Sequence, residues 1–520
     1  FNSWWIYYEE MIDFQNIPYS DTNSFSEFIL DYLNGDSKEN IYCKSPKIQE
    51  FEKQIFEKSN HYIDRKLLVD VLYSQNQNFN LSKKSSDNIQ SLNQESSFTV
   101  TTGHQLCLFT GPLYFIYKII STINLCEQLN YKYNSKKFVP VYWMASEDHD
   151  FNEINHINLF GKKIIWDSKQ NGAVGKMHLD GLEKLVLEIK SVLGDDDRSL
   201  KLINLIQSSY LNSKNLADAT RSFVLDLFGK FGLVVIDGDS LDLKKRFIPL
   251  IKKDVLQKGF FDAITKSTAD FTRKYKQQAF VRDINFFKLS KNKRERITEG
   301  ILEREIDISP HKFSPNVFLR PLYQELILPN IAYVGGGAEL TYWMQLKLAF
   351  IQEKIPFPIL VLRNSALIVT KKQSQKIHRL GFDMRDFFQS EEAIKKRFII
   401  SNSKKKLSVD NEIKNLNLIY KNLKDKTDDE SMRSSINSLL HKHIISIEEL
   451  HKKLVRFEKK QNETSLGQIT NLKKSLFPDK ILQERHNNFI EYYFKYGDNF
   501  IETLKEKFDP LNPNFVILTF

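Results

Sequence analysis

Apolar residues change their spacing along the chain, and each spacing predicts a different element. Between residues 18 and 94 they recur every three or four positions in EFILDYL, KIQEFEKQIFEKS and YIDRKLLVDVLYSQN, as in helices with one buried face. Ser-, Asn- and Gln-rich linkers separate these stretches and end near Asn93. We therefore expect a mostly helical N-terminal segment.

Continuous apolar runs replace this spacing further along the chain and predict strands buried on both faces. They lie at 97–102, 139–145, 232–237, 329–334 and 356–362. After the first run, Pro112 opens a predicted helix. Its apolar stripe holds Ile116, Ile119, Ile120 and Ile123, and its opposite face holds Tyr114, Lys118 and Ser121. Strand–loop–helix units of this kind predict an α/β protein with a parallel-sheet core.

A long, charged helical texture sets residues 409–465 apart. Ile413, Leu416, Tyr420 and Leu423 form one heptad arm, and Ile447, Leu450, Leu454 and Phe457 form a second. The polar stretch 424–431 between them predicts an antiparallel helical hairpin. Because one hairpin would bury its apolar seam incompletely, we expect a homodimer through this region.

These patterns divide the chain into six segments. They are an N-terminal helical segment (11–95), the first part of the core (96–160), a connecting insertion that returns to the core near 232–257 (161–300), the second part of the core (301–400), the helical hairpin (401–470) and a tail that docks on the core (471–520).

Composition narrows the class of protein. The 520 residues are 41% apolar, enough for a large core, and their net charge of +10 comes without a basic arm, which disfavours nucleic-acid binding. No apolar run reaches the roughly 18 residues of a membrane span. Residues 1–10 lack the features of a signal peptide; we interpret them as an over-extended reading frame or an artificial remnant.

The cysteines indicate a reducing environment. Cys43, Cys107 and Cys126 are odd in number and show no CxxC spacing, so we expect no disulfide framework and a cytoplasmic protein. Cys107 lies in the apolar stretch LCLF, where a free cysteine usually behaves as a small buried hydrophobe. We predict that it is structural.

Three loops follow predicted strands at the position where parallel α/β sheets bind ligands. They are 103–111, 146–156 and 335–339, and we expect them to converge on one cleft. The first, TGHQLCLFTGP, enters a helix N-terminus that favours an anion, with Gly103 and Gly111 for close approach and His104 and Gln105 as donors. A tight turn with a satisfied histidine would explain the same residues, and the Walker A pattern is absent.

The second loop, SEDHDFNEINH, places Glu147, Asp148, His149 and Asp150 directly after a buried strand. Four ionisable groups there are costly unless they are solvated or liganded. They could bind Mg²⁺, bind a ligand amine or hydroxyl, or act as a base; the alternative is a polar cap on the next helix. A zinc site with His156 would have no cysteine ligand, so we predict no resident metal ion.

The third loop, VGGGAELTYW, sets Gly335, Gly336 and Gly337 between a strand and a helix. Three glycines allow a flat ligand such as adenine or ribose to lie against the backbone. Glu339 would accept hydrogen bonds from ribose hydroxyls or complement the helix dipole. The glycines alone do not match the GxGxxG pattern.

Together these segments resemble the BshC family, the cysteine-adding enzymes of bacillithiol biosynthesis. The matching segments follow in order over most of the chain: IPYSDTNSF, TTGHQLCLFTGPLYFIYKIIS, VPVYWMASEDHDFNEINH, SPNVFLRPLYQELILPNIAYVGGGAELTYWMQLK, PFPILVLRNSALIV and LFPDKILQER. One departure is His104, where many relatives have Gln; hydrogen bonding would suit both residue types, whereas proton exchange would not.

The resemblance implies a Rossmann-like core with connecting insertions, a coiled-coil domain and a dimer. It also implies a ligase that joins the carboxyl group of L-cysteine to the amine of glucosaminyl-malate, giving bacillithiol. A weaker resemblance links TGHQ, ASEDHD and GGGAEL to loops of class I aminoacyl-tRNA synthetases, without a KMSKS-type signature or a tRNA-binding module. The alternatives are therefore a synthetase-like nucleotide-binding protein acting on another amino acid or on tRNA, and a non-catalytic scaffold.

Amide formation from a carboxylate and an amine is uphill in water, so we expect an activated cysteinyl carboxylate, with ATP or another nucleotide and Mg²⁺ as cofactors. The candidate catalytic residues are Asp148, His149, Glu147 and His104. The candidate substrate- and nucleotide-binding residues are Gly103, Gln105, Thr110, Gly111, Tyr114, Lys118, Asn316, Arg320, Gly335, Gly336, Gly337, Glu339, Arg363 and Ser365.

Overall fold

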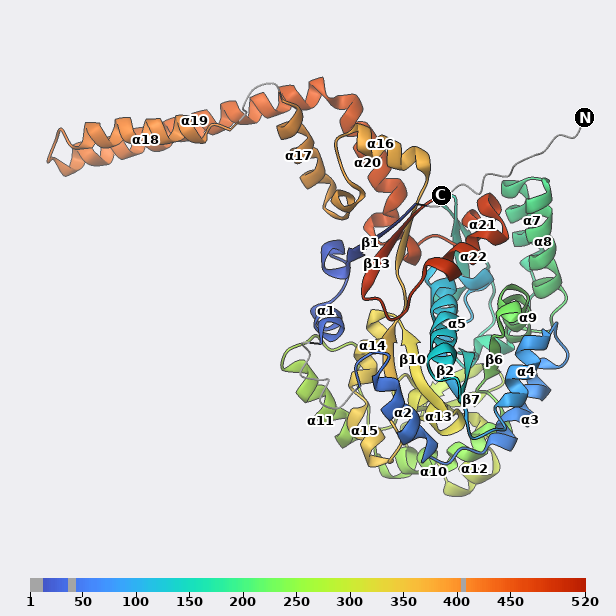
Figure 1. The fold of residues 1–520 in the computed structure, drawn as a ribbon. Coiled ribbons are helices and arrows are strands. Elements are labelled where there is room, and N and C mark those ends of the chain that lie inside the picture. Colours follow the sequence, from blue (N-terminus) through green and yellow to red (C-terminus); the bar gives the residue numbers. More distant parts are fainter. Residues whose placement is uncertain (1–12, 36–43, 404–407) are drawn as a thin grey trace, which may run out of the picture.

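The centre of the molecule is a parallel sheet (Figure 1). The computed structural model describes residues 13–35, 44–403 and 408–520. The sheet has five strands in the order β11 (Ile359–Leu362), β10 (Asn330–Gly335), β2 (Ser97–His104), β3 (Lys137–Met144) and β6 (Val234–Asp237). Every neighbouring pair is parallel. The α/β parallel core is thus confirmed, and its strands are those that the apolar runs predicted.

Helices cover both faces of this sheet. On one face α5 (Tyr114–Lys132) packs on β2 and β3, and α2 (Glu50–Ser59) packs on β10. On the other face α10 (Leu241–Gln257), α13 (Leu319–Ile327) and α3 (Arg65–Asn76) share an apolar cluster with the sheet. The result is a three-layer core in which alternate strand residues enter opposite layers.

The predicted two-faced character of α5 is wrong. Lys118 and Ser121 are as buried as the isoleucines, because Lys118 reaches Glu339 and Ser121 bonds to Asn364. Helix α22 (Asp498–Lys507) also packs on α5. The helix also begins at Tyr114, two residues after Pro112. A lysine buried inside a three-layer core needs a nearby carboxylate or carbonyl to hold its charge.

Two elements lie where the sequence indicated linkers or left the chain unassigned. Helix α4 (Lys83–Ser91) occupies the polar stretch before Asn93, and the Ser82 side chain caps it by accepting from the Ser85 amide. Strand β1 (Asp13–Pro18) pairs antiparallel with β13 (Asn514–Thr519), whose other edge pairs in parallel with β12 (Ala366–Val369). The predicted docking of the apolar ending is therefore seen, as part of a second sheet. The interpretation of residues 1–10 lies outside the described residues.

The connecting insertion supplies helices and two β-hairpins. Three of its helices follow one another along the chain, α7 (Leu182–Leu193), α8 (Asp197–Ile206) and α9 (Leu216–Phe228). The first hairpin joins β4 (His156–Leu159) and β5 (Lys162–Ile165). The basic segment KLSKNKRERI forms the second, β7 (Phe286–Ser290) and β8 (Lys293–Arg296), and β9 (Phe313–Pro315) pairs with β7.

The remaining α-helices of the described ranges complete the outer layers. They are α1 (Glu27–Asn34), α6 (Phe151–Ile154), α11 (Phe261–Thr272), α12 (Glu303–Ile308), α14 (Gly337–Met344), α15 (Lys347–Gln352), α16 (Lys371–Arg379), α17 (Glu391–Asn402), α20 (Glu463–Leu476) and α21 (Ile490–Tyr496). Over the part of the chain that the structure describes, no helix has the length and apolar content needed to cross a bilayer.

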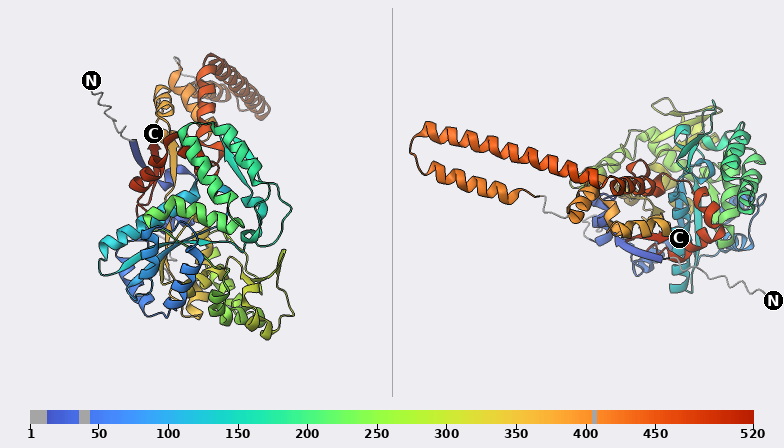
Figure 2. Two further views of the ribbon diagram at one scale, coloured as in Figure 1. Left: turned by 90° about the vertical axis from the view of Figure 1, so that its right-hand side faces the viewer. Right: turned by 90° about the horizontal axis from the view of Figure 1, so that it is seen from above.

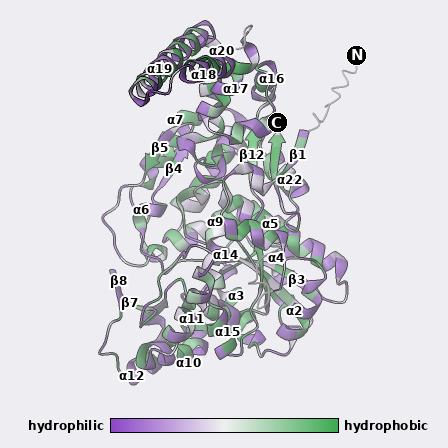
Figure 3. Ribbon diagram, turned by 90° about the vertical axis from the view of Figure 1, so that its left-hand side faces the viewer, coloured by the Kyte–Doolittle hydropathy of each residue, from purple (hydrophilic) through white to green (hydrophobic). Residues whose placement is uncertain are grey.

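The predicted helical hairpin is confirmed and projects away from the core (Figure 2). Its arms are α18 (Asp410–Lys424) and α19 (Glu430–Gln461), and Tyr420 is buried between them, hydrogen-bonded to His443 at 2.7 Å. Hydrophobic and hydrophilic residues alternate along it (Figure 3). Leu450, Leu454 and Phe457 lie on the part of α19 that outruns α18, and 57%, 43% and 60% of their surface is exposed.

Candidate functional site

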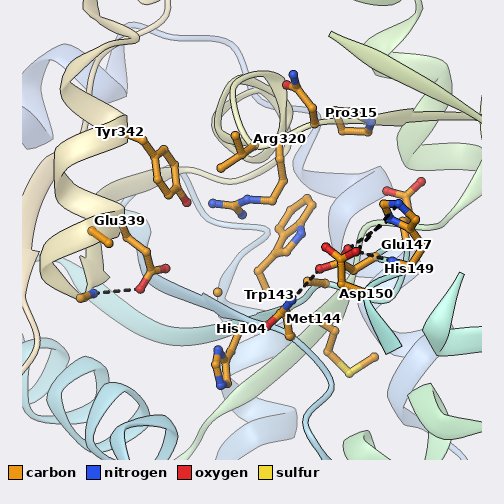
Figure 4. Close-up of a pocket in the computed structure, with 18 of the residues that line it drawn as sticks. His104, Trp143, Met144, Glu147, His149, Asp150, Pro315, Arg320, Glu339 and Tyr342 are labelled. Carbon is orange, nitrogen blue, oxygen red and sulfur yellow. Dashed lines mark hydrogen bonds and ion pairs between the residues drawn. The ribbon is translucent and has the colours of Figure 1, made fainter. Parts of the chain in front are cut away.

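A cleft of about 930 Å³ opens at the carboxyl ends of β2, β3 and β10. Gly103, Asp148 and Gly336 all line it, so the predicted convergence of the three loops is confirmed. In Figure 4, Glu339 and Tyr342 lie on one side and Glu147, His149 and Asp150 on the other, with Arg320 and Trp143 between them.

Glu339 on the glycine-rich loop already has a full set of partners. Its carboxylate pairs with buried Lys118 at 2.5 Å and accepts hydrogen bonds from the Tyr333 hydroxyl and the Gly336 amide. Burial raises the pKa of this carboxyl, but the Lys118 ammonium and the hydrogen bonds outweigh burial and hold the pKa below its usual value. The predicted role in ribose binding is therefore disfavoured, because Glu339 caps α14 and neutralises Lys118.

Arg363 lines the cleft beside this loop, whereas Gly335 and Ser365 are not among the lining residues that the structure describes. Arg363 pairs with buried Glu484 at 2.7 Å and donates to the Ser365 hydroxyl at 3.0 Å. Among the residues that the structure describes, its Nε has no hydrogen-bond partner. Ser365 thus orients Arg363 rather than contacting a ligand.

The first loop reaches the cleft with only its leading residues. Gly103, His104 and Gln105 line it, but Thr110 and Gly111 are absent from the described lining. The entrance to α5 is covered by the tail, since the Leu113 amide donates to the Asn487 carbonyl and Asn488 donates to the Gly111 carbonyl. These contacts disfavour the predicted anion site at this helix N-terminus.

His104 and Gln105 also differ from the donors that were predicted. Burial, with help from Lys118 and Arg363, holds the pKa of His104 well below its usual value, so this imidazole is neutral near neutral pH. The Gln105 amide nitrogen donates to Asp148 and to Glu153, both at 2.9 Å. A side chain that serves two carboxylates in this way orients the acidic loop instead of holding a phosphate.

Within the acidic loop, Glu147 and Asp148 have different surroundings. Glu147 pairs at 2.5 Å with fully buried Lys244, which also donates to the Phe313 carbonyl. Burial raises the pKa of Glu147 against the opposing effect of Lys244. Asp148 accepts from the Gln105 side chain and from the His149 amide, and its carboxylate stays within reach of the cleft.

His149 receives a contact from the connecting insertion. Nη1 of Arg294, on β8, lies 3.0 Å from His149 Nδ1 and 3.8 Å from Asp148 Oδ1. The remaining Arg294 donors bind the Ser314 hydroxyl and the Pro315 carbonyl, and its guanidinium stacks on Phe287 at 3.9 Å. The basic hairpin thus forms one wall of the site.

Asp148, His149 and Asp150 could bring three ligand atoms within 4.8 Å of one another, the spacing of a metal site. Arg294 argues against such a site, because it occupies His149 Nδ1 and adds a positive charge beside Asp148. A cation would have to displace this guanidinium or share the carboxylate with it. The described residues therefore do not fit a resident metal ion.

A second carboxylate, Asp254, supports the cleft from behind. It is fully buried and accepts from the backbone amide of Asn285 and from that residue's side chain. Asn285 in turn accepts from the Asn316 side chain, and both asparagines line the cleft. Burial raises the pKa of Asp254 to about 6.

Several lining residues were missed by sequence reasoning. They are Trp143, Arg282, Asn285, Phe287, Arg294, Arg296, Tyr342 and Arg485. The run KNKRERI is basic, but nothing local shows that β7 and β8 fold back over the acidic loop. Arg282, Arg296, Arg320 and Arg485 have no carboxylate partner within the described ranges, and Nη2 of Arg320 is buried without a hydrogen-bond partner.

Comparison with known proteins accounts for the chain along nearly its whole length. The family model for the N-terminal Rossmann-like domain of the bacillithiol biosynthesis protein BshC matches residues 12–364, and the model for its C-terminal coiled-coil domain matches residues 366–520.

Relatives named "Putative cysteine ligase BshC" are similar over the same span. The Flavobacterium psychrophilum protein is 39% identical over 96% of this chain and 98% of its own length. The Flavobacterium johnsoniae protein is 40% identical over 97% and 99%, and the Bacillus anthracis protein is 27% identical over 92% and 95%.

Proposed function

Because the chain belongs to the BshC family of bacillithiol biosynthesis, we propose that it is the ligase that joins the carboxyl group of L-cysteine to the amine of glucosaminyl-malate. The product is bacillithiol, and the new bond is an amide. Two sets of charges in the cleft support this reaction, one for the acidic part of the acceptor and one for its amine.

The observation that carries the proposal is the group of arginines without carboxylate partners. Arg282, Arg296, Arg320 and Arg485 line one continuous cleft. Arg320 is half-buried and the other three are exposed, so all four can meet a solvated anion, and guanidinium groups match carboxylates or phosphates in a bidentate way. The malate part of the acceptor carries two carboxylates, and an activated cysteine would carry a phosphate. Arg320, with its unsatisfied Nη2 between the two sides of the cleft, is the leading candidate to bind one of them.

Asp148 is the proposed proton acceptor. The incoming amine is protonated near neutral pH and must lose a proton before it attacks an acyl carbon. Asp148 is held by neutral donors, with the one cation Arg294 at 3.8 Å, so its carboxylate can attract an ammonium group. Glu147 is less suited to this role, because Lys244 already pairs with it.

We also propose that a nucleotide, ATP or a relative, activates the cysteine carboxyl, with Mg²⁺ carried on its phosphates. When bound, the nucleotide would supply the phosphate-bearing leaving group that makes amide formation downhill. Gly336, Gly337 and Ala338 line the cleft at the start of α14, where the first N–H groups have no partner inside the helix. The Gly336 amide already donates to Glu339, so the amides of Gly337 and Ala338, with Arg363, would bind the anion.

Two experiments test the proposal. Thiol analysis of the host with and without this gene should show loss of bacillithiol and accumulation of glucosaminyl-malate. With the purified enzyme, Arg320→Gln should raise KM for glucosaminyl-malate by roughly tenfold or more. Arg273→Gln, which changes an exposed arginine just after the end of α11, should not. Normal bacillithiol in the deleted strain, or binding of total tRNA by the purified protein, would favour the synthetase-like alternative.

We propose that the protein is a homodimer through the helical hairpin. Support comes from Leu450, Leu454 and Phe457, which remain exposed on α19 beyond the reach of α18. The mass in solution should be that of two chains. It should fall to that of one chain in Leu450→Lys/Leu454→Lys, but not in the matched exposed variant Lys452→Ala.

A cytoplasmic location remains part of the proposal. Cys107 and Cys126 are free and buried, which fits a reducing compartment. Cys43 lies outside the described residues. Cell fractionation with an antibody against the protein tests this location.

A further inference from the structure

The contact between Arg294 and His149 joins two residues 145 positions apart in the sequence. Arg294 stands on hairpin β7–β8, which also supplies Arg296 to the cleft. Each of its three guanidinium nitrogens has a partner, Nε the Ser314 hydroxyl, Nη2 the Pro315 carbonyl and Nη1 His149 Nδ1. Stacking on Phe287 holds the plane of the guanidinium. Arg294 therefore has little freedom to turn toward a substrate.

The chemistry of the two side chains determines which one donates. A guanidinium carries only donors and keeps its charge in proteins, so Arg294 can only donate to the imidazole. His149 Nδ1 must then offer its lone pair, which leaves the ring proton of a neutral imidazole on Nε2. His149 Nε2 lies 4.0 Å from Asp150 Oδ1, too far for a hydrogen bond, so this N–H is available to a ligand in the cleft.

We propose that Arg294 is a positioning residue that holds His149 in the Nε2–H form, so that His149 acts as a hydrogen-bond donor to the reacting acyl oxygen and not as the base. This inference rests on the proposed ligase function and assigns different roles to two residues of the acidic loop. Asp148 takes the proton of the amine, and His149 stabilises the negative charge that develops on the oxygen.

The reaction then balances as follows. Asp148 first takes one proton from the ammonium group. The neutral amine nitrogen then bonds to the acyl carbon of the activated cysteine, and the carbonyl electron pair moves onto the oxygen. The His149 Nε2–H donates to that oxygen at the moment its charge is greatest. The electron pair returns as the phosphate-bearing group leaves, the second proton of the nitrogen passes to that leaving group, and the amide remains.

The groups around His149 fit a donor better than a base. The charged neighbours that face it are Asp148, Asp150 and Arg294, and Phe287 packs against its ring with centroids 5.6 Å apart. His149 cannot act as a base through Nδ1, because the lone pair of Nδ1 already accepts from Arg294. His149 could act as a base through Nε2 only if its ring proton moved to Nδ1, and that proton would then face the N–H of Arg294.

The first test reads the tautomer directly and needs no substrate. Full-length protein labelled with ¹⁵N at the histidine rings should show His149 protonated at Nε2 alone near neutral pH, with the signal assigned by its loss in His149→Gln. Arg294→Gln should remove this preference, whereas Lys293→Gln, an exposed neighbour on the same hairpin, should leave it unchanged. A proton on Nδ1 in the wild-type protein would overturn the proposal.

The second test separates a donor from a base. A glutamine amide can replace the Nε2–H donor but cannot accept a proton, so His149→Gln should retain much more kcat than His149→Ala, which should lose roughly 100-fold or more. Arg294→Gln should lower kcat about tenfold, as expected for a group that orients a functional histidine. Arg294→Lys, which keeps the charge but not the fork, should restore little of this loss.

These outcomes also separate the inference from the proposed function. Equal loss of kcat in His149→Gln and His149→Ala, with ligase activity present in the wild type, would overturn the donor role alone. Absence of ligase activity in the wild type, together with the Nε2–H form by NMR, would overturn the proposed function and leave the positioning by Arg294 standing.

Discussion

Glu339 and Asp148 occupy equivalent places in the fold and differ in what surrounds them. Each lies four residues beyond the end of its strand, β10 for Glu339 and β3 for Asp148, and these strands flank β2 in the same sheet. Their side chains are 21% and 23% exposed, and both line the cleft. Glu339 pairs with Lys118 at 2.5 Å, whereas Asp148 is held by neutral donors with its nearest cation at 3.8 Å.

The difference shows that position and exposure do not identify a functional carboxylate. Glu339 stabilises the structure, because its carboxylate pairs with a buried lysine and accepts hydrogen bonds from a tyrosine and a backbone amide. Asp148 retains charge that a substrate can use. Substitutions that remove each charge should therefore have opposite effects on activity and stability, and this contrast can be tested.

The largest effect is expected for Asp148→Asn. Loss of the proton acceptor should reduce kcat for bacillithiol formation by roughly 10²–10⁴-fold, while the thermal midpoint stays close to that of the wild type. Mass spectrometry of the product and a melting curve on the same sample provide the two measurements. Near-normal turnover would show that the acidic loop is structural, and partial rescue by added Mg²⁺ would identify Asp148 as a ligand of the ion instead.

Glu339→Gln should show the reverse pattern. It leaves the Lys118 ammonium buried without its counter-charge, which should lower the free energy of unfolding by about 3–5 kcal/mol. Chemical denaturation measures this loss. The double variant Lys118→Met/Glu339→Gln removes both charges and should recover part of it. A stable Glu339→Gln protein without activity would mean that Glu339 belongs with Asp148 after all.

Asp254 should give the protein a pH-dependent stability. Its folded pKa of about 6 lies above the unfolded value, so the folded state binds the proton more tightly. This contribution is fully present below about pH 4 and is lost as pH rises through 6, a change of about 3 kcal/mol. Urea unfolding at several pH values should show a flatter profile for Asp254→Asn than for the wild type. Asp262→Asn, an exposed carboxylate on α11, should keep the wild-type profile.

The smallest effect is expected for Cys107→Ala. Burial raises the pKa of the Cys107 thiol to about 12, so no thiolate forms near neutral pH and the residue cannot act as a nucleophile. Activity should stay close to the wild-type value, and the lost packing should cost about 1 kcal/mol. Full loss of activity in a stably folded variant would contradict a structural role.

Periodicity and strand position predicted the parallel sheet, the hairpin and the convergence of the three loops, because these depend on local pattern and on a general rule of α/β sheets. They could not predict partners that come from distant segments. Helical spacing placed Lys118 opposite the apolar stripe of α5, and nothing local showed that its ammonium pairs with Glu339, which comes from a distant segment of the chain.

The same limit explains the misplaced anion site. The start of α5 has the residues of an anion-binding loop, but Asn487 and Asn488 arrive from the tail, almost 380 residues away, and satisfy its backbone groups. Arg294 is the opposite case. It lies on a distant hairpin and contacts His149 in the site, and nothing in the sequence of the hairpin indicates this role. In both cases a long-range contact decides between a structural and a functional role.

The second sheet constrains the order in which the chain is assembled. Strand β1 pairs residue for residue with β13, and about 500 residues separate the two. At ribosomal rates of about 5–20 residues per second, β1 must wait roughly 25–100 s for its partner to be made. During that time its ladder edge is open to pairing with other nascent chains. Its sequence, DFQNIP, limits this hazard, because the charge of Asp13 and the missing amide of Pro18 make a poor template for aggregation.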